Sequence, residues 1–400
     1  MGFGEALLGV QLATALHKAG DEVLFLAPAG LAHVVRAAPV RYGRIDLALS
    51  QLDAAVLDTA RSEGCASIVL IDLVAVYTFF GVYGRSFAAF LRSGIPVVAL
   101  DVWNVPEAGL AWDYHPETFA MGPEILDAVH RLVPVPFVRP TVPAGYNALP
   151  PPQPWSAADR QAERSSLGIG PDERLIFWPS AAWQHASQQL HPARQRMAAA
   201  LPPLIVHYLK CLSQTAGSPP IRVVHVGPEP FAAASALGDR YVHLTQQPAA
   251  RFARILAASD LLLSFNVAAT TVMAALSAQV PVLIGTHSAR PGDLPPASEM
   301  TDAVRTFCAA AGDVYPFRAW PLSLSRLLAP VLHENPLLDA VRLVGVLDES
   351  AMLSALRELI SDGGAETQRA RQERYVAQVQ ALPGPVAQFR TVLARAQDRA

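Results

Sequence analysis

The sequence has few lysines and no excess of either charge, and both shortages limit what it can bind. Its 400 residues carry 31 basic and 34 acidic side chains, and Lys18 and Lys210 are the only lysines. The formal charge of −3 provides no positive field that would hold a polyanion. Nucleic acid is therefore not expected as a partner.

Cysteines and paired histidines are scarce as well. Cys65, Cys211 and Cys308 form no CxxC or CxxH pattern, and the histidines form no HxH, HxxxH or HExxH pattern. An odd, sparse cysteine set argues against a disulfide framework and a structural zinc, and is typical of a reducing compartment. The sequence therefore predicts no bound metal and no other cofactor.

Long apolar runs are also missing. No run reaches the roughly 18–20 residues that a helix needs to cross a bilayer, and the start shows no basic segment followed by an apolar one. The 52% hydrophobic share nevertheless provides for a large core, and a chain of this length favours two domains. We interpret the sequence as a soluble cytoplasmic protein without an integral membrane segment.

Strand-like and helical segments alternate in both halves of the chain. Continuous Val/Ile/Leu runs joined by helices are typical of parallel sheets covered on both faces, which predicts the α/β class with two Rossmann-like domains. Expected strands are 22–26, 67–71, 96–100, 175–178, 222–226, 261–264 and 281–284; expected helices are about 53–63, 82–93, 191–216, 250–258, 268–278 and 348–361. The last helical stretch, with a break at 383–385, is expected to fold back on the first domain.

Eight prolines between 134 and 155 suggest the domain boundary, because proline neither continues a helix nor donates to a sheet ladder. We expect a first domain at 1–139, a proline-rich linker at 140–155, a second domain at 156–364, and C-terminal helices at 365–400.

The opening of the chain lacks an expected element. A doubly wound sheet normally begins with a strand that leads into a glycine-rich turn and a helix. Here only Met1 precedes Gly2-Phe3-Gly4-Glu5. We hypothesise that the working protein has one more strand before this turn; the alternative is a sheet with one strand fewer.

The stretch from Ile255 to Ile284 resembles the donor-binding region of GT-B-fold glycosyltransferases. Ser259-Asp260 stands at the family's turn, Asn266 at its histidine, Thr270-Thr271 at its Gly-Thr pair, and Val280-Pro281 closes the unit. Ala274 and Gln279 depart from the family pattern, in which an acidic residue and a glycine stand at these positions.

The resemblance implies a second domain that binds a nucleotide sugar and a first domain that binds the acceptor, facing each other across a cleft. Amides and hydroxyls at a helix N-terminus are suited to holding a diphosphate. The donor-side residues that it implies are Ser180, Gly227, Gln246, Asn266, Thr270, Thr271 and His287. The alternatives are an N-cap role for Ser180, a surface position for His287, and an ordinary βα unit around Thr270.

Sugar transfer needs a base for the acceptor hydroxyl. Asp72 and Asp101 follow strands, at the sheet edge where ligands bind, and Glu5 lies at the first helix N-terminus. These three are the candidate catalytic residues; loop capping is the alternative for the aspartates, and a plain helix-terminal charge for Glu5. Acceptor-side candidates are Gly2, Gly4, Tyr77 and Arg318, although glycines of a tight turn and aromatic packing would explain them too.

We therefore expect a glycosyltransferase that moves a sugar from a nucleotide-sugar donor to a small-molecule acceptor, without a metal. Two alternatives stay open. One is a GT-B-fold nucleotide-sugar epimerase, and the other is a catalytically degenerate protein that binds or activates a partner.

Overall fold

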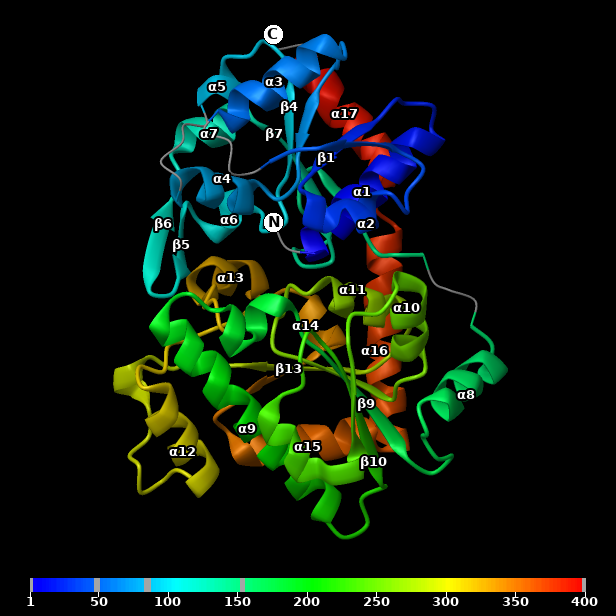
Figure 1. Cartoon of the computed structure of the whole chain (residues 1–400), viewed down its shortest axis with the longest axis vertical. Coiled ribbons are helices and arrows are strands. Elements are labelled where there is room, and N and C mark those ends of the chain that lie inside the picture. The colour runs from blue at the N-terminus through cyan, green and yellow to red at the C-terminus, as the bar shows by residue number, and fades with distance from the viewer. Residues whose placement is uncertain (1–2, 47–50, 83–87, 152–154, 398–400) are drawn as a thin grey trace.

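Two α/β lobes lie one above the other in the computed structural model (Figure 1). The structure describes residues 3–46, 51–82, 88–151 and 155–397. Each lobe contains a parallel sheet with helices packed around it, and the predicted fold class is confirmed.

The N-terminal lobe contains a four-stranded parallel sheet in the order β3-β4-β7-β8, a separate parallel pair β1-β2, and an antiparallel hairpin β5-β6. Its strands are β1 Leu24–Ala27, β2 Arg41–Arg44, β3 Ile68–Leu70, β4 Val97–Leu100, β5 Ala111–Tyr114, β6 Glu117–Ala120, β7 His130–Val135 and β8 Gly145–Asn147. Its helices are α1 Phe3–Lys18, α2 Ala32–Val35, α3 Leu52–Ser62, α4 Leu73–Val82, α5 Ala88–Leu91, α6 Val105–Ala108 and α7 Pro123–Ala128.

Helix α1 contacts side chains from both parallel sheets of this lobe. A methyl group built on Gly9 would lie 2.1 Å from Cδ1 of Ile71, which follows β3, and 3.1 Å from Cζ of Phe25 in β1. Only glycine therefore lets α1 approach this closely. The pair β1-β2 and the four-stranded sheet share no ladder within the described residues, so side chains beneath α1 connect them.

Two expectations for this lobe are corrected. The range 140–155, interpreted as a linker, contains strand β8, which pairs with β7 and buries Tyr146. The prolines around it flank the strand, where no ladder hydrogen bond is required of them. Of the helix expected at 82–93, the described residues show α5 at Ala88–Leu91, and the longer helix α4, which begins directly after Asp72 and ends at Val82, was not expected.

The C-terminal lobe contains a six-stranded parallel sheet in the order β11-β10-β9-β12-β13-β14. Its strands are β9 Arg174–Pro179, β10 Ile221–Val226, β11 Tyr241–Leu244, β12 Leu261–Ser264, β13 Val282–Thr286 and β14 Arg342–Gly345. Its helices are α8 Ala157–Ser166, α9 Pro192–Gln214, α10 Ala249–Ala257, α11 Thr270–Ser277, α12 Asp302–Ala311, α13 Ser325–Leu332, α14 Leu337–Ala340, α15 Glu349–Ile360 and α16 Asp362–Gln380. The strands and helices expected here from the apolar runs are confirmed to within about two residues.

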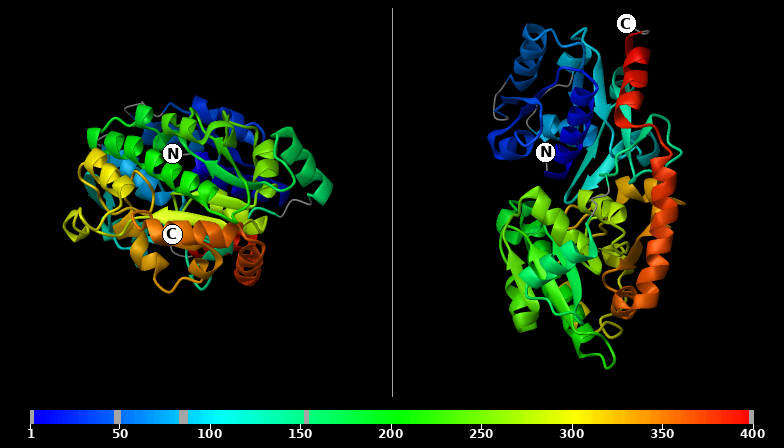
Figure 2. Two further views of the ribbon diagram at one scale, coloured as in Figure 1. Left: turned by 90° about the horizontal axis from the view of Figure 1, so that it is seen from below. Right: turned by 90° about the vertical axis from the view of Figure 1, so that its right-hand side faces the viewer.

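The last two helices connect the lobes. Helix α16 runs along the C-terminal lobe, and α17 (Pro385–Gln397) packs on α1 and β7 of the N-terminal lobe (Figure 2). The Tyr375 hydroxyl of α16 donates to the Pro136 carbonyl at 2.6 Å, and the Asn335 amide donates to the Phe137 carbonyl at 2.9 Å. The expected fold-back of the C-terminal helices is therefore confirmed.

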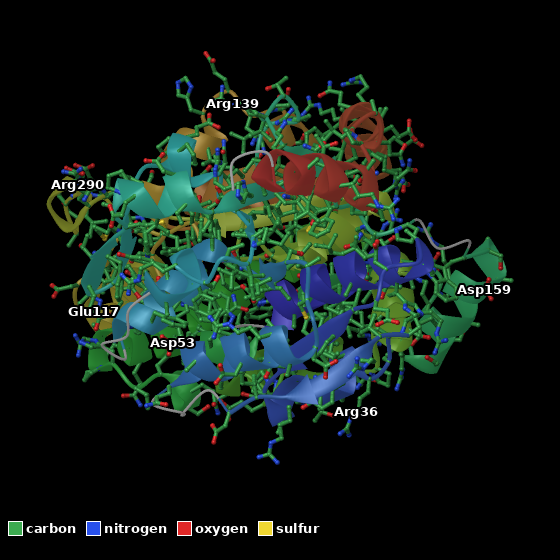
Figure 3. All side chains as sticks on the ribbon, turned by 90° about the horizontal axis from the view of Figure 1, so that it is seen from above. Arg36, Asp53, Glu117, Arg139, Asp159 and Arg290 are labelled. Atoms are coloured by element: carbon green, nitrogen blue, oxygen red, sulfur yellow. The ribbon has the colours of Figure 1, made fainter. Side chains whose placement is uncertain are left out.

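Charged side chains of both signs are spread around the molecule. Arg36, Arg139 and Arg290 lie among Asp53, Glu117 and Asp159 in the view of Figure 3. Within the described part of the chain, no helix combines the length and the apolar character needed to cross a bilayer.

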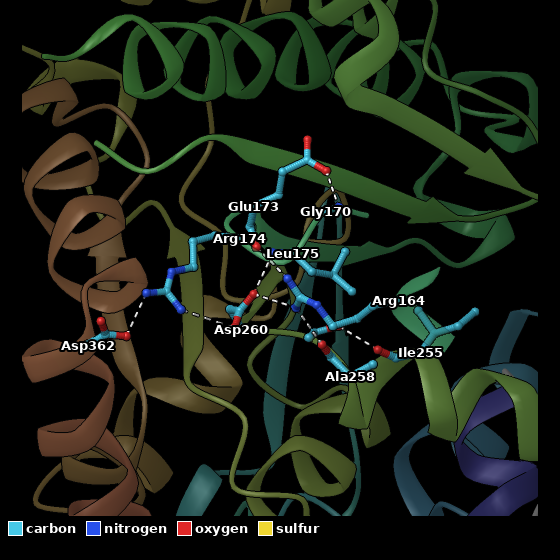
Figure 4. Close-up of polar contacts among 10 residues, drawn as sticks. Arg164, Gly170, Glu173, Arg174, Leu175, Ile255, Ala258, Asp260 and Asp362 are labelled. Carbon is cyan, nitrogen blue, oxygen red and sulfur yellow. Dashed lines mark hydrogen bonds and ion pairs between the residues drawn. The ribbon is translucent and has the colours of Figure 1, made fainter. Parts of the chain in front are cut away.

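Asp260, in the turn that suggested the family resemblance, has a structural role. Its carboxylate accepts hydrogen bonds from the Leu175 amide at 2.7 Å and from Arg164 at 2.9 Å, and Arg174 in turn pairs with Asp362 (Figure 4). These contacts join β9 to the start of β12. They set the register of the two strands whose carboxyl ends carry Ser180 and Asn266.

Candidate functional site

Asp72 lies at the carboxyl end of β3 in an unusual conformation. Its φ of 63° is left-handed, which is uncommon for a residue other than glycine and often marks a functional position. The side chain is 1% exposed, and Oδ1 accepts hydrogen bonds from the Ala75 amide at 2.9 Å and from Nε1 of Trp103 at 3.3 Å. Asp72 thus caps α4. The same carboxylate also accepts a hydrogen bond from Trp103, a site residue that was not predicted from the sequence.

The charge of Glu5 acts on the carboxyl group of Asp72. Burial, and then the charge of Glu5, raise the pKa of Asp72 to about 7. Oε2 of Glu5 is buried without a hydrogen-bond partner among the described residues. A carboxyl group that titrates near neutral pH, beside a second one with a free oxygen, is suited to accepting a proton.

Asp101 lies at the end of the neighbouring strand β4 and is fully buried. Its oxygens accept hydrogen bonds from the Val105 amide and from Arg131, both at about 3.1 Å. Burial raises the pKa of Asp101, and those two partners oppose the change. The carboxylate of Asp101 therefore caps α6 and holds an arginine, which distinguishes it from the Glu5–Asp72 pair.

The acceptor-side candidates of this lobe lie in two places. Gly4 is in the first turn of α1, and a methyl group built on it would lie 3.2 Å from both Cγ2 and Oγ1 of Thr270 in the other lobe. Tyr77 lies in α4, with its ring edge-on to Trp112 at 6.2 Å between centroids. Gly2 is outside the described residues.

The N-terminus of α11 faces α1 across the junction of the lobes, which we call the interlobe seam: Gly4 and Glu5 on one side, Thr270 and Thr271 on the other. No side chain caps α11, whose N-cap is Ala269, and the amides of a first helical turn have no acceptor within their helix. Asn266 precedes this turn, and its Oδ1 accepts from the Ala268 amide at 3.0 Å. Asn266, Thr270 and Thr271 are all partly exposed.

Ser180, at the end of β9, lies between two histidines. Its hydroxyl is 2.8 Å from Nε2 of His185 and 2.7 Å from Nε2 of His225. One hydroxyl proton can serve only one of these nitrogens, so Ser180 donates to one imidazole and accepts from the other. Nδ1 of His225 lies 2.5 Å from the Tyr241 hydroxyl. Burial lowers the pKa of His185, and it lowers that of His225 to about 3, so both rings are neutral at pH 7.

Gly227 lies close to the Ser180–His225 network. Gln246 lies close to the N-terminal lobe. A methyl group on Gly227 would be 2.2 Å from Oγ of Ser180 and 2.6 Å from Nε2 of His225, so the network requires glycine here. Nε2 of Gln246 lies 3.3 Å from Nε2 of His33 in α2, which makes Gln246 an interlobe contact.

His287 and Arg318 lie together at the end of β13, beneath the segment 315–323. His287 is 3% exposed, so the alternative of a surface histidine is wrong; burial and then the charge of Arg318 lower its pKa to about 4. Arg318 donates to Thr286 at 3.3 Å, and it therefore lies beside donor-side residues of the C-terminal lobe. Nε2 of His287 and Nε of Arg318 are buried without a partner among the described residues.

A cavity of about 400 Å³ lies between the β5-β6 hairpin and the segment before α9. Arg194 crosses it, 4.5 Å above the ring of Tyr114 and 3.2 Å from Glu117. Burial raises the pKa of Tyr114, and the charge of Arg194 opposes this change. Its lining residues are Tyr114, Glu117, Trp183, Gln188, Gln189, Leu190, His191, Arg194 and Leu322.

A family model described as a family of unknown function (DUF6365) matches residues 12–397. The chain belongs to this family. No curated protein matches this DUF6365 chain in sequence.

Solved structures share the fold of this DUF6365 chain at low sequence identity. The spinosyn forosaminyltransferase SpnP has a TM-score of 0.53 and 12% identity, over 96% of this chain and 95% of that one. CalG4, the calicheamicin glycosyltransferase, has a TM-score of 0.50 and 15% identity, over 99% and 96%. Alr3699/HepE of Anabaena, in complex with UDP and glucose, has a TM-score of 0.50 and 12% identity, over 99% and 96%. The expected GT-B-like fold is confirmed over nearly the whole chain.

Proposed function

We propose that this protein is a glycosyltransferase that moves a sugar from a nucleotide-sugar donor to the hydroxyl of a small molecule. The observation that carries the proposal is the interlobe seam. It places the first turn of α1, with Gly4 and Glu5, opposite the uncapped N-terminus of α11, and the charge of Glu5 acts on the buried carboxyl group of Asp72. A base opposite an anion-binding helix terminus is the arrangement that sugar transfer requires.

The donor diphosphate binds at the start of α11. The amides of Thr270 and Thr271 point along the helix axis, and the helix dipole favours negative charge at this end. Ser180 lies at the same carboxyl edge of the sheet, on β9 next to β12, with its hydroxyl oriented by His185 and His225. Gln246, at the end of β11, is placed to contact the nucleoside.

The acceptor binds in the cavity beside Tyr114. Its volume falls within the roughly 300–1,000 Å³ that is usual for small-molecule sites. Tyr114 and Trp183 provide aromatic walls, and Arg194 and Glu117 provide charge at the rim.

The chemistry is a direct displacement. The acceptor hydroxyl oxygen bonds to the anomeric carbon while the bond from that carbon to the diphosphate oxygen breaks. The hydroxyl proton passes to the Glu5–Asp72 pair, and the negative charge that leaves with the diphosphate is stabilised by the α11 amides. No metal enters this sequence of steps.

Titration with nucleoside diphosphates tests the proposal. At 100 times its Kd, a ligand that binds only the folded state stabilises it by about 2.7 kcal/mol. We expect UDP, dTDP or another nucleoside diphosphate to raise the melting temperature, and the free nucleoside to have a much smaller effect. The matching nucleotide sugar and acceptor should then release one diphosphate for each sugar transferred.

Two results would replace the proposal. No stabilisation by any nucleotide favours the degenerate partner-binding protein. If the protein converts a nucleotide sugar to its epimer and releases no nucleoside diphosphate, the interlobe seam is the site of an epimerase.

A further inference from the structure

Three side chains with metal-ligating atoms meet where α9 packs on α15, at the end of the C-terminal lobe that is remote from the N-terminal lobe (Figure 1). His207 and Cys211 are four residues apart on α9, so they lie on one face of the helix. Glu349 is the first residue of α15. Their ligand atoms all lie within 4.8 Å of one another.

The two distances from Nε2 of His207 to the other ligand atoms suit a tetrahedral ion. Zinc bonds of about 2.0–2.1 Å to nitrogen or oxygen and about 2.3 Å to sulfur place two ligands roughly 3.3–3.6 Å apart. Nε2 of His207 lies 3.2 Å from Oε1 of Glu349 and 3.6 Å from Sγ of Cys211. The third pair, the sulfur of Cys211 and a carboxylate oxygen of Glu349, lies within 4.8 Å.

The groups around the cluster fix the Glu349 carboxylate and leave His207 accessible to water. The Thr301 hydroxyl donates to Oε2 of Glu349 at 2.5 Å, which fixes the carboxylate with its other oxygen toward His207. A second partner of this kind orients ligands in many metal sites. His207 is 37% exposed, so a water molecule can reach a fourth coordination position.

We propose that His207, Cys211 and Glu349 bind a zinc ion that links α9 to the start of α15, with water as the fourth ligand. One nitrogen, one sulfur and one oxygen ligand favour zinc over magnesium or calcium, which prefer oxygen alone. Binding releases the thiol proton to solvent and requires no oxidant. The expectation of no metal rested on the absence of paired histidines or cysteines, and the mixed His–x3–Cys spacing of His207 and Cys211 on α9 is not such a pair.

Cobalt(II) substitution tests the site through its absorption spectrum. We expect the metal-free wild-type chain to bind one Co²⁺, with a thiolate-to-cobalt charge-transfer band that one equivalent of Zn²⁺ removes. C211S should lose the band, and H207A and E349Q should weaken Zn²⁺ binding at least 100-fold. T301V, which removes the partner of Glu349 together with the N-cap of α12, should weaken it by roughly 10–100-fold while the metal-free chain stays folded.

Controls separate the site from a structural ion pair. C308S changes a cysteine of α12 outside the cluster, and it should bind Co²⁺ and Zn²⁺ as the wild type does. Melting of every variant without metal shows whether it is folded. A band that survives in C211S, or wild-type Zn²⁺ affinity no higher than that of E349Q, would overturn the proposal and leave His207–Glu349 as an ion pair beside a thiol.

Discussion

Replacing Asp72 by Asn is expected to slow sugar transfer by about 10²- to 10⁴-fold, the usual contribution of a general base. The Asn oxygen can still accept from the Ala75 amide and Trp103, and Asn tolerates the left-handed φ of 63°. The loss therefore reports the missing charge and not a broken turn.

The same substitution should raise stability at neutral and higher pH. The folded chain holds a proton on Asp72 up to about pH 7, whereas the unfolded chain releases it near pH 4. Between these values the folded state binds more protons, so the stability of the wild type falls as the pH rises. We expect D72N to be more stable than the wild type by on the order of 2–4 kcal/mol at pH 8, and by little at pH 4.

Transfer rates and urea unfolding at pH 4, 6 and 8 check both parts. The wild-type rate should increase with pH through about 7, since the ionised pair is the base. D113N is the matched control, because the partly buried Asp113 also accepts hydrogen bonds from helix-terminal amides, those of Ser325 and Arg326, outside the proposed base. A D72N transfer rate within threefold of the wild type, or a D72N chain less stable at pH 8, would remove Asp72 from the mechanism.

Replacing Thr271 by Asp is expected to weaken nucleotide binding roughly 100-fold without destabilising the fold. A carboxylate in a first helical turn stabilises the helix by about 0.3–1 kcal/mol. The same charge about 5 Å from a diphosphate opposes binding by about 3 kcal/mol at an effective dielectric constant of 20, which is roughly 100-fold in Kd.

Calorimetric titration with the nucleoside diphosphate, together with thermal melting, measures the two effects. T271V keeps the shape of the side chain and loses only its hydroxyl, so it should weaken binding far less than T271D. Equal affinities of T271D and the wild type would exclude the start of α11 as the diphosphate site.

The spacing of apolar residues along the sequence was enough to predict where most strands and helices of the C-terminal lobe lie. Apolar runs such as 261–264 coincide with strand β12 because all four side chains are buried between helices on both faces. The strands that were missed in the N-terminal lobe are short, and the ten-residue helices α4, α8 and α12 were missed as well. The hairpin β5-β6 and strand β8 have three or four residues each, and pairing, not composition, makes them strands.

The candidate site was only partly predictable, for a physical reason. Asp72 was identified because it follows a strand, but its raised pKa depends on burial and on Glu5, 67 positions earlier in the chain. The contact of Ser180 with His225 joins residues 45 positions apart through neighbouring strands. Spacing along the chain cannot reveal such pairs. They form because strands that are distant in sequence become neighbours in a sheet, and the local sequence does not determine the order of those strands.

The most direct measurement for this account is a crystal structure of the protein with the nucleoside diphosphate that stabilises it most. We predict phosphoryl oxygens within hydrogen-bond distance of the Thr270 and Thr271 amides, on the side of the seam that faces Glu5. A diphosphate bound elsewhere, with the start of α11 still closed against Gly4, would contradict the account.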